Sequence, residues 1–340
     1  KEYVRAHDFR RYLHKNLEDF IVETPLKEPL SELIRDYDNS IDQSIEKSWK
    51  PYDFENSDID TFLDELSIDK SVKVSPIKGG YKNAKNRLNE FIEKGYCDYA
   101  QYRSDPSKRA SSEMSPYFHF GQISTHEVFE KIVQHEGWSP EKINPSLAGR
   151  REGWWGGSFN MESFFDELIT WRELGYHTCV RRANYNQYSS LPEWAIKTLG
   201  EHSSDTREYV YTLEELTYSQ THDEIWNAAQ NQLREEGVIQ NYLRMLWGKK
   251  ILEWSPNPQV ALSYMITLND RYSLDGRDPN SYSGVFWVLG RYDRAWGPER
   301  QIYGKIRYMT SDSAARKFNL KPYMEKWGNS QDRFDTSFSK

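Results

Sequence analysis

The stretch NYLRMLWGKKILEW, residues 241–254, decides the fold class because it reads as one long helix of unusual content. Trp247 and Trp254 are seven residues apart, so both rings leave one face of that helix, about 10.5 Å apart along its axis. Arg244 lies among apolar positions, where an unpaired buried charge is very costly, and Asp275 is a plausible partner for it. The stretch alone leaves open whether the two rings only fill a core or also carry electrons.

Helical patterns continue on both sides of this stretch. The residues before it read as a second helix that joins it near Gly237, and the residues after it read as a third that closes at Gly276. Strand signals are scarce, so we predict an all-α, mostly helical fold. Composition predicts three parts: linker helices and an acidic loop in residues 1–79, a helical domain in residues 80–330, and a tail in residues 331–340.

The composition argues against several classes of protein. No apolar run reaches the ~18 residues that a membrane helix needs, and two cysteines are too few for a disulfide framework or a four-cysteine cluster. The motifs GxGxxG, GxxxxGK[ST], HExxH and GxSxG are absent, and the eight histidines do not cluster at metal spacing. We therefore expect no metal and no membrane, and we regard simple hydrolases, kinases and metalloenzymes as weak candidates.

The charge is distributed unevenly along the chain. The net charge is −7, which argues weakly against a general nucleic-acid binder. Residues 42–69 hold nine acidic side chains against two lysines, whereas residues 271–321 hold ten basic side chains against five acidic ones. This late basic zone could be an ordinary solvated surface, or it could bind a phosphate backbone.

Seven motifs occur in order along residues 80–325: SPYFHFGQIS, DELITWRE, YTLEEL, THDEIWNAAQ, YLRMLWGKKILEW, LNDRYSLDGRDPNSY and GKIRYM. Each is weak alone, but together they resemble the photolyase/cryptochrome family, most closely class II photolyases for cyclobutane pyrimidine dimers. The resemblance implies a helical catalytic domain around a U-shaped FAD. It also implies an N-terminal antenna domain that has no counterpart in this chain, so we expect no antenna chromophore site here.

The resemblance implies a light-driven reaction in which excited, reduced FAD donates an electron to the dimer, which splits and returns it. It assigns FAD contacts to the serine-rich loop before a helix, where hydroxyls and free N–H groups suit a pyrophosphate. The ion pair of Arg244 and Asp275 is assigned to the isoalloxazine, and Asn269 to flavin N5. The full set of cofactor residues is Tyr99, Ser111, Ser112, Met114, Ser115, Arg172, Arg244, Asn269, Asp275 and Asp278.

The same resemblance assigns the substrate and electron-transfer residues. Glu167 hydrogen-bonds the dimer, Trp171 and Trp287 enclose the flipped-out lesion, and Met245 packs against it, so that Glu167, Asn269 and Met245 are the expected catalytic residues. The chain of tryptophans expected to photoreduce oxidised FAD consists of Trp226, Trp247 and Trp254. From residues alone, each of these rings is equally well explained as core filling.

The sequence also departs from the class II pattern. Ile239, Gln240 and Asn241 stand where Met-His-Gly is usual, and residues 145–160, with Trp154 and Trp155, look like an insertion. These changes place the chain in a divergent branch. We expect a DNA-repair lyase that binds damaged DNA as a monomer and acts in the cytoplasm, or in the nucleus of a eukaryote. The alternatives are a cryptochrome-like photoreceptor without repair and a light-independent module that binds FAD or nucleic acid.

Overall fold

The structure, a computed structural model, describes residues 1–21, 25–26, 28–31, 41–53 and 58–328 of the chain. In these ranges the chain is helical, and its only extended pairings are isolated bridges, Arg5 with Tyr292 and Arg300 with Gly304. The all-α prediction is therefore confirmed. Within the same ranges every helix is too short or too polar to cross a bilayer.

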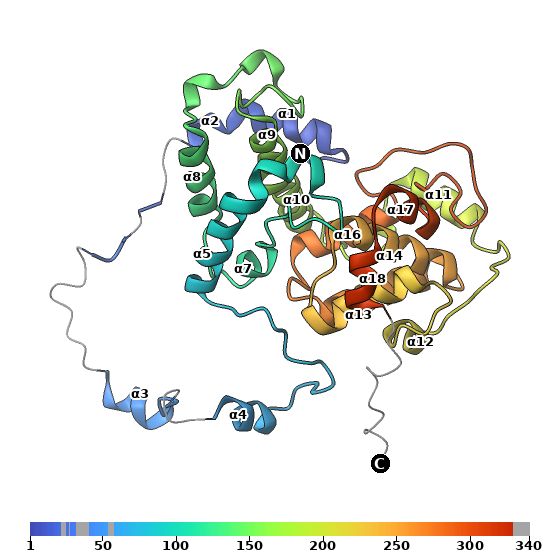
Figure 1. Cartoon of the computed structure of the whole chain (residues 1–340), viewed down its shortest axis with the longest axis horizontal. Coiled ribbons are helices and arrows are strands. Elements are labelled where there is room, and N and C mark those ends of the chain that lie inside the picture. The colour runs from blue at the N-terminus through green and yellow to red at the C-terminus, as the bar shows by residue number, and fades with distance from the viewer. Residues whose placement is uncertain (22–24, 27, 32–40, 54–57, 329–340) are drawn as a thin grey trace.

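The first group of helices surrounds one apolar core (Figure 1). It consists of α5 (Tyr81–Glu90), α6 (Tyr99–Tyr102), α7 (Ser115–His119), α8 (Thr125–Glu136) and α9 (Phe159–Phe165). The apolar spacing that predicted a helix in this region holds, because Ala84 and Leu88, one turn apart in α5, are both fully buried. This group supplies one wall of the site described below.

A second group of helices surrounds a larger core on the other side of the molecule (Figure 1). It consists of α11 (Glu193–Glu201), α12 (Leu213–Thr217), α13 (Glu224–Glu236), α14 (Asn241–Trp254), α15 (Pro258–Tyr272), α16 (Pro279–Val288), α17 (Ser311–Lys317) and α18 (Lys321–Trp327). Gly237 ends α13 at a φ of 78°, a left-handed conformation that favours glycine, as the sequence predicts. By contrast α15 ends at Tyr272, four residues before the predicted stop at Gly276, because Ser273 already leaves the helical region.

One helical rod connects the two groups. It runs from α9 through a π-helical segment, Asp166–Trp171, into α10 (Arg172–Arg181). The first helix, α1 (Ala6–Asn16), packs on this rod, where Arg10 forms a two-pronged ion pair with Asp166 at 2.6 and 2.9 Å. This pair lies next to Glu167, so the N-terminal helix helps to fix the segment that carries a predicted site residue.

The two tryptophans of the loop at 145–160 fill core volume. Trp154 and Trp155 are buried at 1% and 3% exposure. The ring of His14 in α1 stacks on Trp154 with a centroid distance of 3.9 Å, and Trp138 donates its indole N–H to the Trp155 carbonyl at 2.6 Å. These two rings therefore join α1 to the first group of helices.

The N-terminal linker is described only in part. It includes α2 (Glu18–Ile21), α3 (Gln43–Ser48) and α4 (Ile59–Glu65), and the last two lie away from the main body in Figure 1. Asp69 of the acidic loop pairs with Arg271 at 2.7 Å, so part of this acidic charge meets the late basic zone. The predicted tail, residues 331–340, lies outside the described residues, and the three-part division of the chain stays a prediction.

Candidate functional site

A cavity of about 1580 Å³ opens between the two groups of helices. Single-ligand pockets usually measure ~300–1,000 Å³, so this cavity has room for more than one ligand of ordinary size. The first group contributes the segment from Tyr99 to Phe118, and the second contributes the amino-terminal half of α14, part of α16 and the loop after it. The connecting rod contributes Glu167 and Trp171.

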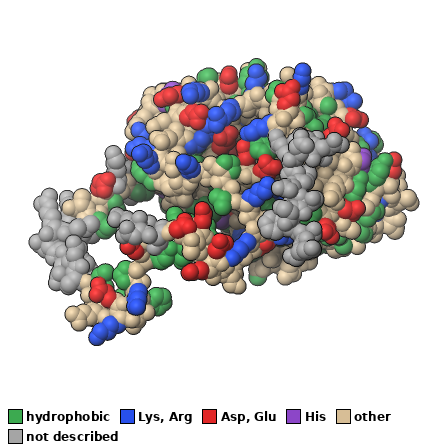
Figure 2. Space-filling model, turned by 60° about the horizontal axis from the view of Figure 1, so that its bottom comes forward, with side chains coloured by type: hydrophobic (Ala, Val, Ile, Leu, Met, Phe, Trp, Pro, Cys, Tyr) green, Lys and Arg blue, Asp and Glu red, His purple; other side chains and the backbone are tan. Residues whose placement is uncertain are grey.

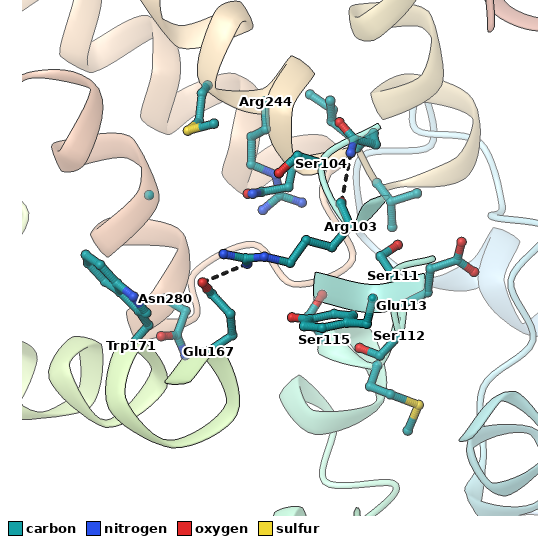
Figure 3. A pocket seen from close by; sticks show the side chains of 18 of the residues that line it. Arg103, Ser104, Ser111, Ser112, Glu113, Ser115, Glu167, Trp171, Arg244 and Asn280 are labelled. Carbon is teal, nitrogen blue, oxygen red and sulfur yellow. Dashed lines mark hydrogen bonds and ion pairs between the residues drawn. The ribbon is translucent and has the colours of Figure 1, made fainter. Parts of the chain in front are cut away.

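Four predicted cofactor residues form the serine loop, which consists of Ser111, Ser112, Met114 and Ser115 and leads into α7, whose first residue is Ser115. Met114 is 1% exposed and anchors the loop in the core, whereas the serines lie at the cavity (Figure 3). Arg87 of α5 donates hydrogen bonds to the carbonyls of Ser111 and Ser112, both at 3.0 Å. Sequence reasoning missed Arg87, because an arginine in a surface helix carries no signal of the loop it holds.

The predicted pair of Arg244 and Asp275 forms at the cavity wall, with 3.6 Å between Nη1 and Oδ1. Burial would raise the pKa of Asp275, but the Arg244 cation and hydrogen bonds from Ser273 and Ser115 outweigh burial and lower it below its ordinary value. Asp275 is therefore ionised at neutral pH. The result is a fixed cation–anion pair at the edge of the cavity.

Glu167 and Trp171 come from the π-helical segment of the rod, and π-helical turns are frequent at functional sites. The Glu167 carboxylate forms an ion pair with Arg103, with 2.7 Å between Oε1 and Nη1. Figure 3 shows the Arg103 side chain reaching across the cavity to Glu167. Withdrawal from bulk water raises the pKa of Glu167, although the Arg103 charge opposes that rise.

Arg103 is a second residue that sequence reasoning missed. It follows a short helix in the polar turn YRSDPS, where nothing distinguishes it from a surface arginine. In the structure its guanidinium lies 5.7 Å from the centre of the Tyr99 ring, and Gln240 donates to its backbone carbonyl at 3.1 Å. Gln240 also caps α14 by accepting hydrogen bonds from Tyr242 and Leu243, so one of the divergent positions fixes the approach of α14 to Arg103.

The opposite wall carries Met245 of α14 and Trp287 of α16, both half-buried and both lining the cavity. Arg307 lies 5.7 Å from the centre of the Trp287 ring. Arg294 and Arg307 of the late basic zone line this cavity, whereas Arg291 is buried and donates to the Tyr185 carbonyl at 2.8 Å. Figure 2 accordingly shows basic side chains interspersed with acidic ones, with no continuous basic face on the side it presents.

Three further predicted cofactor residues either have a partner within the protein as well or do not line the cavity. Asp278 lines the cavity, but it also caps α16, where it accepts from the Asn280 backbone at 2.8 Å. Arg172 lines the cavity and pairs with Glu173 at 2.5 Å. Asn269 is buried in α15 but does not line the cavity, and its side chain donates to Asp270 at 3.3 Å, so its contact with a flavin stays a prediction.

The three predicted electron-transfer rings are all buried, and Trp226 of α13 contacts α14 at both of the other two positions. Trp226 of α13 donates its indole N–H to the Trp247 carbonyl at 3.0 Å. Its ring packs edge-on against that of Trp254, with 5.6 Å between centroids. Trp226 therefore contacts the ring of Trp254 and the backbone of Trp247, and so joins the two positions of α14 that carry the other tryptophans. Around Trp254, the ring of His222 lies at 5.2 Å and that of Tyr211 at 5.5 Å.

The described residues contain no group of three or more His, Cys, Asp or Glu side chains placed to hold a metal ion. Both cysteines are free in the structure, and burial raises the pKa of Cys179 to about 11, which suppresses its thiolate. Among these residues the chemistry of the site rests on carboxylates, arginines, serines and aromatic rings.

Comparison with known proteins gives clear relatives. A deoxyribodipyrimidine photo-lyase of Methanothermobacter thermautotrophicus is 41% identical over 252 residues, covering 74% of this chain and 51% of the relative. One of Potorous tridactylus is 38% identical over 263 residues, covering 77% and 46%. The chain thus spans about half the length of the curated relatives it matches.

Solved structures share the fold. A bacterial class III photolyase from Agrobacterium tumefaciens superposes with a TM-score of 0.51 at 19% identity, over 73% of this chain and 44% of that one. No family model matches the chain.

Proposed function

The chain belongs to the photolyase/cryptochrome family, and on that basis we propose that it binds FAD and uses light to split cyclobutane pyrimidine dimers in DNA. One observation carries the proposal: a single cavity is lined by the serine loop, the Arg244–Asp275 pair and the aromatic and acidic residues Glu167, Trp171 and Trp287. The first two suit a dinucleotide cofactor, and the last three suit two linked adjacent bases taken out of the stack.

The residues present fit FAD. The serine hydroxyls are donors for a pyrophosphate, and Arg244 is a fixed cation that favours an anionic flavin ring beside it. The cavity volume accommodates a dinucleotide together with a second ligand. When bound, the flavin supplies the light-driven electron donation, and the protein supplies position and charge.

The substrate end of the cavity provides stacking and hydrogen bonding. Trp171 and Trp287 offer ring faces to pyrimidines, and stacking of this kind contributes ~1–3 kcal/mol per base. That offsets the few kcal/mol needed to flip the lesion out of the duplex. Glu167 accepts hydrogen bonds from the N–H groups of the dimer, and the Arg103 cation opposes the rise that burial causes in its pKa.

We assign the three tryptophans to an electron-transfer chain that serves the flavin. Trp247 lies two residues beyond Met245 on α14, and the contacts of Trp226 continue the path to Trp254. An indole ring is readily oxidised, so we assign these rings to the reduction of oxidised FAD. Repair itself starts from reduced FAD and needs no such route.

The proposal is tested by replacing Glu167→Gln, which keeps shape and removes the charge. Reduced protein is illuminated with a thymine-dimer oligonucleotide, and FAD content is measured on the same samples. We expect the repair rate to fall at least ~10-fold with FAD content unchanged, because one lost charge-assisted hydrogen bond accounts for ~1.5–3 kcal/mol. Glu130→Gln, at an exposed position of α8, is the matched control and should repair like the wild type.

The same assay distinguishes a photoreceptor without repair activity from a repair enzyme. A protein that binds FAD and photoreduces it but leaves dimers intact would support a sensor instead of a repair enzyme. A protein that binds no FAD would contradict both readings.

A further inference from the structure

Lys249 of α14 is buried with 0% exposure, although lysine is rarely found away from water. It lies one helical turn beyond Met245, on the side of α14 that faces α16. Its ammonium group donates a hydrogen bond to the carbonyl of Val288 at 2.5 Å. None of the functions assigned above uses this lysine.

The ammonium group of Lys249 contacts two parts of α16. Val288 is the last residue of that helix, so its carbonyl lies at the negative end of the helix dipole, where a cation is favourable. The same ammonium lies 5.2 Å from the centre of the Trp287 ring, within cation–π range. Gly248 allows this approach, because a Cβ there would lie 2.6 Å from Val288 Cγ2.

We propose that Lys249 is a positioning residue for Trp287: it joins the end of α16 to the ring and so sets where the ring stands in the cavity. When Lys249 loses its charge, the cation–π contact between its ammonium group and the Trp287 ring is lost. The proposal deepens the function proposed above, because it rests on Trp287 being a stacking surface for the flipped-out lesion.

The charge of Lys249 is adjustable near neutral pH. Burial lowers its pKa to about 7, the negative charge of Asp293 opposes this fall, and the positive charge of Arg307 adds to it. The other ionisable groups nearby are Lys250 and Glu253 on its own helix, which pair with each other at 2.8 Å. The phenol of Tyr303 donates its hydrogen bond to the backbone carbonyl of Lys249 and not to the side chain. Below the pKa the ammonium is charged and holds the ring, and above it the contact weakens.

A direct test follows the ring itself. The protein is labelled with 5-fluorotryptophan, and the Trp287 resonance is assigned by its loss in Trp287→Phe. We expect this resonance to titrate with a midpoint near neutral pH in the wild type and to show no such step in Lys249→Met. Lys250→Met, on the neighbouring position of α14, is the matched control and should keep the titration. A step that persists in Lys249→Met, or is absent from the wild type, overturns the proposal.

Lys249→Arg covers the case in which Lys249→Met does not fold, as judged by circular dichroism. Arginine stays charged, so the Trp287 resonance should remain at its low-pH position at every pH. A titrating resonance in Lys249→Arg would contradict the proposal as well.

A second readout links the ring to the substrate. The affinity for a dimer-containing oligonucleotide should fall about two- to thirtyfold in Lys249→Met, which is the range of a desolvated cation–π contact. The wild type should lose affinity as pH rises through neutrality, and the variant should not show that dependence. If no form binds the lesion, the proposed function fails, while the fluorine titration still decides the role of Lys249.

Discussion

Replacing Asp275→Asn removes one charge of the ion pair at the cavity wall and changes little else in shape. Two unit charges 3.6 Å apart interact by ~4.6 kcal/mol at an effective dielectric constant of ~20. Asp275 is 12% exposed at its side chain, but Arg244 is 29% exposed and regains part of its hydration when the partner is lost. We therefore expect the free energy of unfolding to fall by ~1–3 kcal/mol, below the ~3–5 kcal/mol seen when a fully buried pair is broken.

The loss should depend on pH in a definite direction. The pKa of Asp275 is lowered in the folded protein, so its charge stabilises the fold above the unfolded-state value of ~3.9. That contribution disappears as pH falls through the folded-state pKa. The difference between wild type and variant should be constant above about pH 5 and should shrink below about pH 4.

Urea denaturation at a series of pH values measures this difference. Asp312→Asn, at an exposed position in the first turn of α17, serves as the control and should change the stability by less than ~0.5 kcal/mol. A loss below ~0.5 kcal/mol for Asp275→Asn, or one that grows on acidification, would refute the account of this pair.

Three other predictions concern one tryptophan and two glycines. Trp226→Phe should abolish photoreduction of oxidised FAD while chemically reduced protein still repairs, because this ring contacts both the Trp247 backbone and the Trp254 ring. Transient absorption and the repair assay measure the two activities, with exposed Trp49→Phe as control. Gly237→Ala should destabilise the fold by ~1–3 kcal/mol, because φ is 78° and the new Cβ would lie 2.6 Å from Leu274. Gly200→Ala, inside α11 with open space around it, should instead stabilise by ~0.5–1 kcal/mol in the same denaturation measurement.

Much of the helical architecture follows from local chemistry that a sequence displays. The apolar spacing of α5 and the glycine that ends α13 act within a few residues, so their consequences are visible without a structure. The pairing of Arg244 with Asp275 could be predicted for a related reason: a charge among apolar positions demands a partner, and Asp275 was a plausible one.

What the sequence could not show are contacts that depend on how distant segments meet. Arg103 and Glu167 are far apart in the chain and meet in the folded protein, where Gln240 of α14 also contacts the Arg103 backbone. Trp154 and Trp155 stand in an apparent insertion whose role the sequence left open, and the structure shows their rings packed in the core, Trp154 against His14 of α1. Residue type limits what a side chain can do, and tertiary packing decides which of those possibilities it uses.

The most direct test of the central claim is the fate of a defined lesion under light. Purified protein carrying fully reduced FAD is mixed with an oligonucleotide that contains one thymine dimer, and the dimer is quantified before and after illumination with blue light. The account predicts conversion of dimer to two thymines with turnover under light and none in the dark. Intact dimers after illumination, with the FAD still reduced and the DNA bound, would contradict it.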